Sequence, residues 1–155
     1  MKQVIIYTDG ACLGNPGPGG WCAIATYNGK EKLFCGNEEN TTNNRMELIS
    51  VIEGLKALKE PCNAEIVSDS KYVTEAFNRN WIYSWQTKGW RKADGKPVKN
   101  QELWEELLAL SNSHKVKFTH IKGHNGHIFN EKCDSAAREQ ANLIQAKQPE
   151  NIPDL

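Results

Sequence analysis

The chain has 155 residues, of which 39% are hydrophobic and 25% charged, and its formal net charge is zero. This length and composition favour one globular domain around a single hydrophobic core and argue against a second large domain. Because no apolar run approaches the roughly 20 residues of a bilayer-spanning helix, and the start MKQVIIYTDG is typical of a strand rather than a signal peptide, we expect a soluble, cytoplasmic protein.

The first half of the chain predicts a strand, a hairpin and a helix. Residues 4–8 are β-branched and aromatic, and we expect this strand to stop at Asp9-Gly10, with LGNPGPGG forming a loop. Asn28-Gly29 predicts a tight hairpin turn between strands over residues 21–27 and 30–35. From Asn44 onward, apolar residues at three- and four-residue spacing predict a helix that ends before Pro61.

The second half predicts strands alternating with helices. Strands are expected over residues 64–68 and 116–121. Helices are expected where apolar residues recur at helical spacing, around Tyr72 to Phe77, Leu103 to Leu108 and Cys133 to Ala141. A hairpin followed by strand–helix units indicates an α/β domain, with helices packed on a mixed sheet.

Four acidic residues distant in the sequence are candidates for a shared site: Asp9, Glu47, Asp69 and Asp134. We expect Asp9 and Asp69 to end strands, where open α/β sheets place their ligand crevice, and the other two to lie in first turns of helices. Carboxylates gathered without basic partners need cations to offset their repulsion. Oxygen ligands favour hard cations such as Mg²⁺, and a pair of ions about 4 Å apart is typical of phosphoryl chemistry.

Each acidic residue also has an ordinary explanation. Asp9 could shape a turn before Gly10, and Glu47 could close a capping box with Asn44. Asp69 could itself be an N-cap, and Asp134 could be a solvated helix residue. The sequence alone leaves these alternatives open.

The five cysteines are an odd number without CxxC spacing. This pattern argues against a disulfide framework or a structural zinc site, so we expect reduced thiols. One zinc alternative remains, because His124, His127 and Cys133 could supply nitrogen and sulfur ligands. A closed structural zinc site needs a fourth protein ligand, which this group lacks.

Several motifs together resemble bacterial ribonuclease H of type 1: YTDGACLGNPGPGG, TTNNRMEL, SDS, WxxxWxxxGW with KPVKN, and KGHNGH followed by NEKCD. They occur in family order and cover essentially residues 1–142. The resemblance implies a ribonuclease H-like fold, with a five-stranded mixed sheet flanked by helices. It also implies an endonuclease that cuts the RNA strand of RNA/DNA hybrids and leaves 5′-phosphate and 3′-hydroxyl ends. Residues 1–142 would form the catalytic domain, with a basic handle at about 80–100 and a flexible polar tail over 143–155.

The resemblance assigns catalytic roles to five residues. Asp9, Glu47, Asp69 and Asp134 would bind two Mg²⁺ ions, with Asp9 bridging them and Mn²⁺ able to substitute. His124 would assist proton transfer or product release, and an unperturbed imidazole, with a pKa near 6.5, could exchange protons at cellular pH. A loop histidine without a catalytic role is the alternative.

The resemblance also implies contacts with the hybrid. One group, near the 2′-hydroxyls that distinguish RNA from DNA, is Cys12, Asn15, Asn43 and Asn44. A second group resembles a pocket for a DNA-strand phosphate and comprises Thr42, Arg45 and Asn100. Lys71, beside Asp69, could add a phosphate contact. Turn and cap formation is the alternative for the asparagines and Thr42.

Residues 79–100 carry six lysines or arginines and one aspartate, a net charge of +5, so the rest of the chain carries −5. Such polarity suits a polyanion held beside bound metal. Trp81, Trp85 and Trp90 interleave with these cations; we expect Trp85 and Trp90 to pack in the core and Trp81 to contact a sugar. Phosphate contacts from this segment would make binding sensitive to salt but not to base sequence.

Two other functions share some of these features. Transposases, integrases and junction resolvases place acidic residues on a similar sheet but act on DNA, and the handle and Asn43-Asn44 argue against them. A hybrid-binding module without catalysis would be expected to lack one of the four carboxylates, and all four are present. We therefore expect an RNA/DNA hybrid as partner, no membrane, no obligate protein partner and a monomer.

Overall fold

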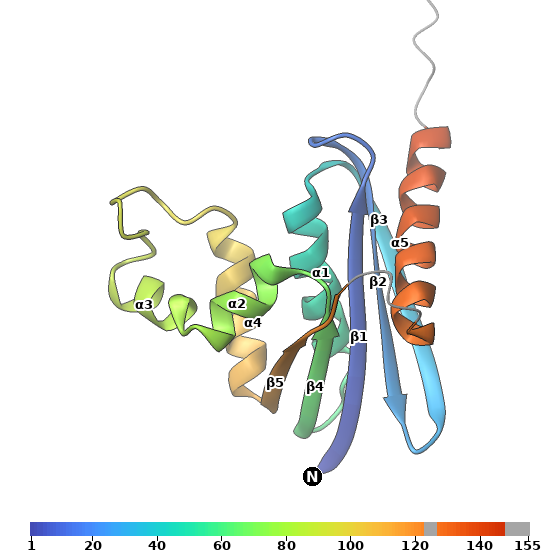
Figure 1. Cartoon of the computed structure of the whole chain (residues 1–155), viewed down its shortest axis with the longest axis horizontal. Helices are drawn as coiled ribbons and strands as arrows, with labels where there is room; N and C mark the ends of the chain where they lie inside the picture. The colour runs from blue at the N-terminus through green and yellow to red at the C-terminus, as the bar shows by residue number, and fades with distance from the viewer. Residues whose placement is uncertain (123–126, 148–155) are drawn as a thin grey trace, which may run out of the picture.

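The structure is a computed structural model, and it describes residues 1–122 and 127–147. Five strands form one sheet in the order β3-β2-β1-β4-β5 (Figure 1). They are β1 (Lys2–Cys12), β2 (Gly17–Tyr27), β3 (Lys30–Thr41), β4 (Cys62–Ser68) and β5 (Lys115–His120). The first three strands pair antiparallel, whereas β4 runs parallel to both β1 and β5. The expected mixed sheet is therefore confirmed.

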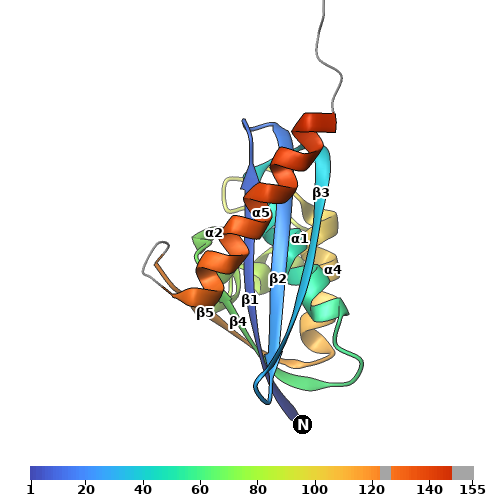
Figure 2. The same cartoon turned by 90° about the vertical axis from the view of Figure 1, so that its right-hand side faces the viewer.

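Helices cover both faces of this sheet (Figure 2). They are α1 (Asn43–Lys56), α2 (Lys71–Asn78), α3 (Trp81–Thr87), α4 (Gln101–Asn112) and α5 (Ile128–Lys147). Helix α5 lies across β1, β2 and β3 on one face, and α1 packs on β1 and β2 from the other side, with α4 beside it. A sheet covered on both faces explains why its central strands are apolar on both sides.

Alternation along the central strands divides the core in two. In β1, Ile6 faces the larger cluster shared with α1, α2 and α4, and the next residue, Tyr7, faces the smaller cluster beneath α5. Ile66 and Val67 divide in the same way in β4. Because successive strand residues point to opposite faces, each central strand contributes apolar side chains to the helices packed on both faces of the sheet.

Strand β1 is longer than expected and corrects two predictions. It continues through Asp9 to Cys12, and β2 already begins at Gly17, so Asp9 lies within a strand and LGNPGPGG is only partly a loop. The two strands stay paired from Asp9 opposite Cys22 to Cys12 opposite Gly19. Glycine is required in this part of β2, because a Cβ at Gly20 would overlap the main chain of α5. The hairpin is confirmed, with positive φ angles of 49° at Asn28 and 75° at Gly29.

The helix starts also differ from the sequence expectations. Helix α1 begins directly after β3, and its N-cap is Thr42, whose hydroxyl accepts a hydrogen bond from the main-chain N–H of Arg45 at 3.2 Å. Glu47 therefore lies in the second turn rather than the first, and Asp134 likewise lies in the second turn of α5. Ser70, not Asp69, caps α2. The capping explanations for Glu47 and Asp69 are therefore wrong.

The basic handle leaves the body of the protein between α2 and α4 (Figure 1, left). It contains α3, a helix that the sequence patterns did not predict. Trp85 and Trp90 pack against the core, whereas 41% of Trp81 is exposed, as expected. At the other end, α5 continues to Lys147, into the segment expected as a tail. Within residues 1–122 and 127–147, no helix combines the length and apolar character needed to cross a membrane.

Candidate active site

Asp9 and Glu47 are brought together by the packing of α1 on β1. Both residues are almost fully buried, with 3% and 4% of their surface exposed. The main-chain N–H of Gly10 donates to the Asp9 Oδ1 atom at 2.9 Å and to the Glu47 Oε1 atom at 3.0 Å. One amide therefore holds an oxygen of each carboxylate, and the second oxygen of each remains available.

Gly10 also permits the close contact between the two elements. A Cβ atom at this position would lie 2.5 Å from the main-chain nitrogen of Glu47 and 2.5 Å from the carbonyl carbon of Met46. Real Cβ atoms do not approach main-chain atoms so closely, so any side chain would push α1 away from β1. Glycine is needed here for the close approach of two backbones.

Asp69 comes from the short connection between β4 and α2. It lies between Ser68, the last residue of β4, and Ser70, the N-cap of α2. The Ser68 hydroxyl accepts from the Ser70 N–H at 3.0 Å, and the His120 Nε2 atom lies 3.2 Å from the Asp69 carbonyl oxygen. The strand end and the helix cap thus fix the backbone that carries Asp69.

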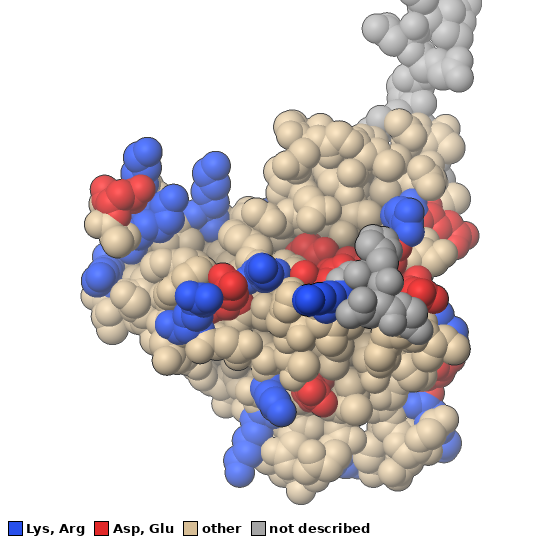
Figure 3. Space-filling view, in the orientation of Figure 1, with Lys and Arg blue, Asp and Glu red and all other residues tan. Residues whose placement is uncertain are grey.

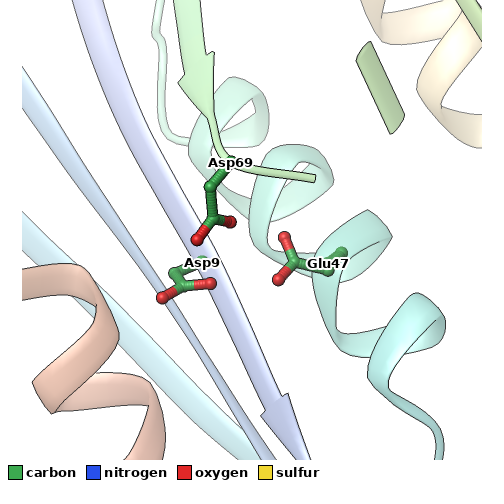
Figure 4. A group of neighbouring side chains, drawn as sticks. All are labelled: Asp9, Glu47 and Asp69. Atoms are coloured by element: carbon green, nitrogen blue, oxygen red, sulfur yellow. The ribbon is translucent and has the colours of Figure 1, made fainter. Parts of the chain in front are cut away.

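These three carboxylates form one group (Figure 4). Asp9, Glu47 and Asp69 each offer an oxygen atom, and these atoms lie within 4.8 Å of one another. The Asp9 Oδ2 and Glu47 Oε2 atoms are buried and have no hydrogen-bond partner. Since a buried polar atom without a partner is costly, the pair fits a ligand that accepts electron pairs. The acidic group is consistent with a metal site.

The burial and closeness of these carboxylates also change their pKa values. Burial raises the pKa of Asp9 from 3.8 to about 7, and the negative charges of Asp69 and Asp134 add to this rise. Burial also raises the pKa of Glu47 well above its ordinary value, with further contributions from Asp9 and Asp69. Without a cation, the group holds protons at a pH where isolated carboxyls are ionised. A divalent cation would favour the ionised form and release those protons.

Asp134 is not part of the three-residue group. It lies on α5, and its carboxylate forms an ion pair with Arg138 one turn later on the same helix. Its charge nevertheless contributes to the raised pKa of Asp9, so it is close to the group.

His124, the expected proton-transfer residue, lies outside the described residues. Cys133, a member of the zinc alternative, is buried, and its thiol donates to the carbonyl oxygen of Tyr7 at 3.2 Å.

A second feature is a hollow of about 510 Å³ between α1 and the handle. It gathers four residues expected to contact nucleic acid: Asn15, Thr42, Asn44 and Asn100. The Asn15 side chain accepts from the Asn43 N–H at 3.0 Å, which ties the β1–β2 loop to the start of α1. Asn100 donates to the Tyr72 hydroxyl at 3.2 Å. These polar residues share the hollow with the aromatic side chains of Tyr72, Trp85 and Trp104.

Other expected contact residues lie outside this hollow. Arg45 pairs with Glu38 at 3.0 Å and Glu102 at 3.1 Å and is not among the residues that line it. The Cys12 thiol lies 3.4 Å from the Thr41 carbonyl oxygen. Lys71 is exposed at the start of α2, next to Asp69. Trp81 lies on α3, where the Arg79 guanidinium stands 5.7 Å from the centre of its ring.

Two cations of the hollow, Lys92 and Lys99, were not singled out from the sequence. They belong to the basic segment 79–100, but that segment alone does not show which of its lysines turn toward Thr42 and Asn100. Figure 3 shows the resulting distribution of charge. Acidic side chains gather near the middle of this face, and lysines and arginines project from the handle at the left. The KPVKN motif was the signal that could have identified Lys99.

Comparisons with known proteins agree with this architecture. The family model described as RNase H matches residues 1–142. Ribonuclease H of Thermus thermophilus is 56% identical over 148 residues, covering 96% of this chain and 89% of that protein. Ribonuclease H of Caldicellulosiruptor saccharolyticus is 56% identical over 138 residues, covering 89% and 95%. The crystal structure of LC9-RNase H1, a type 1 RNase H with the type 2 active-site motif, matches with a TM-score of 0.81 and 31% identity, covering 92% of this chain and 73% of that one. The chain therefore belongs to the bacterial type 1 ribonuclease H family.

Proposed function

We propose that the protein is an endonuclease that hydrolyses the RNA strand of RNA/DNA hybrids with two divalent metal ions and leaves 5′-phosphate and 3′-hydroxyl ends. The observation that carries the metal site is the pair of buried, unpartnered oxygens, Asp9 Oδ2 and Glu47 Oε2. They stand beside Asp69 in one group of carboxylates. The family relationship supports the hybrid as substrate.

The donor atoms suit Mg²⁺, with Mn²⁺ able to substitute. All three residues of the group offer carboxylate oxygens, the ligands that hard divalent cations prefer. Asp9, Glu47 and Asp69 would hold the ions, and Asp134 would be the fourth ligand. Bound divalent cations supply an activated water and stabilise the leaving oxygen of a phosphodiester.

The protein's own residues would hold the reacting groups in place. The Gly10 amide fixes one oxygen of Asp9 and one of Glu47, so the geometry of their remaining oxygens is set before a cation binds. His124 would assist proton transfer or product release. It follows Gly123 in the KGHNGH motif, and its imidazole could exchange protons near neutral pH.

Recognition of the hybrid would combine two surfaces. Cys12, Asn15, Asn43 and Asn44 would contact the minor groove, where 2′-hydroxyls mark the RNA strand. Of these four residues, Asn15 and Asn44 also line the hollow. The hollow with Thr42 and Asn100 would take a phosphate of the DNA strand. Lys92 and Lys99 line the same hollow and supply the positive charge that a phosphate requires.

The remaining contacts would be less specific. Lys71 would add a phosphate contact beside Asp69. Because the Arg45 guanidinium already pairs with Glu38 and Glu102, Arg45 would contribute to the phosphate pocket through its main chain at the start of α1. Trp81 and the cations of the handle would lie along the DNA strand. Binding through this segment would weaken with salt and vary little with base sequence.

We further propose that residues 1–142 are the catalytic domain, that the handle spans about 80–100, and that 143–155 is a polar C-terminal segment, whose first residues continue α5 to Lys147. The protein would act as a monomer in the cytoplasm. All five cysteines are free thiols, which suits a reducing compartment.

The experiment is cleavage of a strand labelled at its 5′ end, with Mg²⁺ or with a chelator. The labelled strand is the RNA strand of an RNA/DNA hybrid, one strand of an RNA duplex or one strand of a DNA duplex. Internal cleavage of the hybrid alone, only with Mg²⁺, is the expected result. Equal cutting of the DNA duplex would instead indicate a DNA-processing enzyme of similar fold. Binding of hybrid without any cleavage would indicate a non-catalytic binding module.

A further inference from the structure

One carboxylate beside the buried acidic group is already engaged by a cation of the protein. The Arg138 Nη2 atom contacts the Asp134 Oδ2 atom, and the two residues are four positions apart on α5. The acidic residue precedes the basic one, the order that favours such pairs on a helix. The Asp134 side chain is 26% exposed and that of Arg138 is 59% exposed. The pair therefore lies at the border between the site and solvent.

Asp134 is close to the three-residue group without being part of it. Helix α5 passes beside Asp9, at the lower left of Figure 4, and packs on β1. The charge of Asp134 contributes to the raised pKa of Asp9. Its oxygens are nevertheless not within the 4.8 Å group formed by Asp9, Glu47 and Asp69. Asp134 is thus an acidic neighbour of the three-residue group, and its carboxylate pairs with the guanidinium of Arg138.

A carboxylate oxygen that accepts from a guanidinium is less available to a metal ion. The same lone pairs would serve both partners, and a guanidinium beside a divalent cation is repelled by it. We propose that Arg138 competes with a divalent cation for the Asp134 carboxylate and so sets the metal concentration at which Asp134 joins the site. This inference rests on the metal site proposed above.

The exchange requires little rearrangement of the fold. Arg138 is more than half exposed, so its side chain can turn into solvent when Asp134 binds the metal. An exposed pair of this kind changes an equilibrium constant by about twofold to fivefold. A change of this size would shift the metal concentration at which the site fills, but the protein would still require the metal. In the absence of metal, Arg138 would offset part of the repulsion that Asp134 adds to the group.

The test is calorimetric titration of the protein with Mn²⁺ alone, in the absence of nucleic acid. Arg138→Gln should bind the metal about twofold to fivefold more tightly than the parent protein. Lys132→Gln is the matched control, because Lys132 lies on the same helix and pairs with Glu31 of β3 at 3.2 Å, away from the acidic group. The control should bind Mn²⁺ as the parent does. Unchanged or weaker binding in Arg138→Gln would overturn the proposal.

A double-mutant cycle separates competition from a general effect of charge. In an Asp134→Asn background, Arg138→Gln should leave the Mn²⁺ affinity unchanged, because the carboxylate for which Arg138 competes has been removed. An equal gain in both backgrounds would mean that Arg138 acts through its charge alone, and would refute competition.

The outcomes also separate this inference from the proposed function. If the parent protein neither binds Mn²⁺ nor cuts hybrid, the metal site fails and the competition fails with it. If the parent protein binds Mn²⁺ and cuts hybrid while Arg138→Gln has the same affinity, only the role of Arg138 is refuted.

Discussion

The main-chain N–H of Gly10 donates to the Glu47 carboxylate at 3.0 Å and thereby joins strand β1 to helix α1 at the acidic group. The same amide contacts Asp9 at 2.9 Å. The two carboxylates are therefore placed by a backbone contact that only glycine permits, rather than by their own side-chain preferences. Their burial and their separation depend on how closely α1 approaches β1.

Gly10→Ala should therefore damage both stability and activity. Its Cβ would lie 2.5 Å from main-chain atoms of Met46 and Glu47, and such overpacking costs about 1–3 kcal/mol. Urea unfolding and Mn²⁺ titration measure the two effects. Gly29→Ala is the control: its Cβ would meet nothing within 4 Å, so only strain from its positive φ should appear, with cleavage retained. Normal metal affinity in Gly10→Ala would refute the role of this contact.

Asp9→Asn and Glu47→Gln should stabilise the metal-free protein while removing cleavage. Each substitution replaces a carboxyl whose ionised form is disfavoured by burial and by neighbouring carboxylates with a neutral amide, so the free-energy cost of burying that carboxyl is removed. We expect a gain on the order of 1 kcal/mol in the free energy of unfolding and a loss of more than about a hundredfold in cleavage rate, since even partners of metal ligands contribute 10–100-fold.

The matched control for these variants is Glu53→Gln, which removes a carboxylate that pairs with Lys56 on the exposed side of α1. It should neither stabilise the protein nor slow cleavage. Substantial cleavage by Asp9→Asn would show that Asp9 is not a ligand, whatever its burial.

The stability of the metal-free protein should fall as the pH rises from about 4 to about 7. Asp9 has its pKa raised from 3.8 to about 7, and that of Glu47 is raised in the same direction. The folded state therefore binds more protons than the unfolded state in this window, and stability decreases with pH by up to about 1.4 kcal/mol per pH unit for each proton.

Urea unfolding in a chelator, over a series of pH values, measures this dependence. Subtracting the curve of Asp9→Asn isolates the contribution of that carboxyl from the other titrating groups. Saturating Mg²⁺ should flatten or reverse the slope, because the cation favours the ionised form. If the difference curve rises across the same window, the Asp9 carboxyl is ionised in the metal-free fold and the assignment fails.

Lys99→Gln should weaken hybrid binding and leave metal affinity unchanged. Lys99 lines the hollow with Thr42 and Asn100, away from the carboxylates, and a phosphate contact contributes about one unit to the slope of log affinity against log salt. Fluorescence anisotropy with a labelled hybrid, in a chelator and over a range of salt, measures that slope. Lys30→Gln, in the hairpin at the start of β3, should leave the slope unchanged. An unchanged slope in Lys99→Gln would remove the hollow from the binding surface.

Local patterns were sufficient to predict most elements, and the four acidic candidates include the three residues that the fold brings together. Asn28-Gly29 specifies its hairpin because both residues adopt positive φ, and Asp69 follows a strand as expected. The place of Asp9 within β1 was not predictable in this way. Gly10 and Gly20 lie in strands β1 and β2, although the sequence predicted a strand end and a loop at these positions. Helix α1 packs closely on Gly10 and α5 on Gly20, so both positions require glycine. This need for glycine arises only from the packing of the helices on the sheet.

The ion pairs also divide into those that local sequence spacing predicts and those that it does not. Arg138 follows Asp134 by four residues, a spacing that indicates a helical ion pair, so this contact could have been found from the sequence. The pairing of Arg45 with Glu102 joins residues 57 positions apart, and nothing local indicates it. Likewise, the basic composition of the handle does not show that Lys92 and Lys99 face the hollow.

The most direct test of the metal site is anomalous scattering from crystals of the protein grown with Mn²⁺. The buried, unpartnered oxygens of Asp9 and Glu47 predict an anomalous peak within coordination distance of both residues and of Asp69. The absence of such a peak at a Mn²⁺ concentration that supports hybrid cleavage would contradict the account.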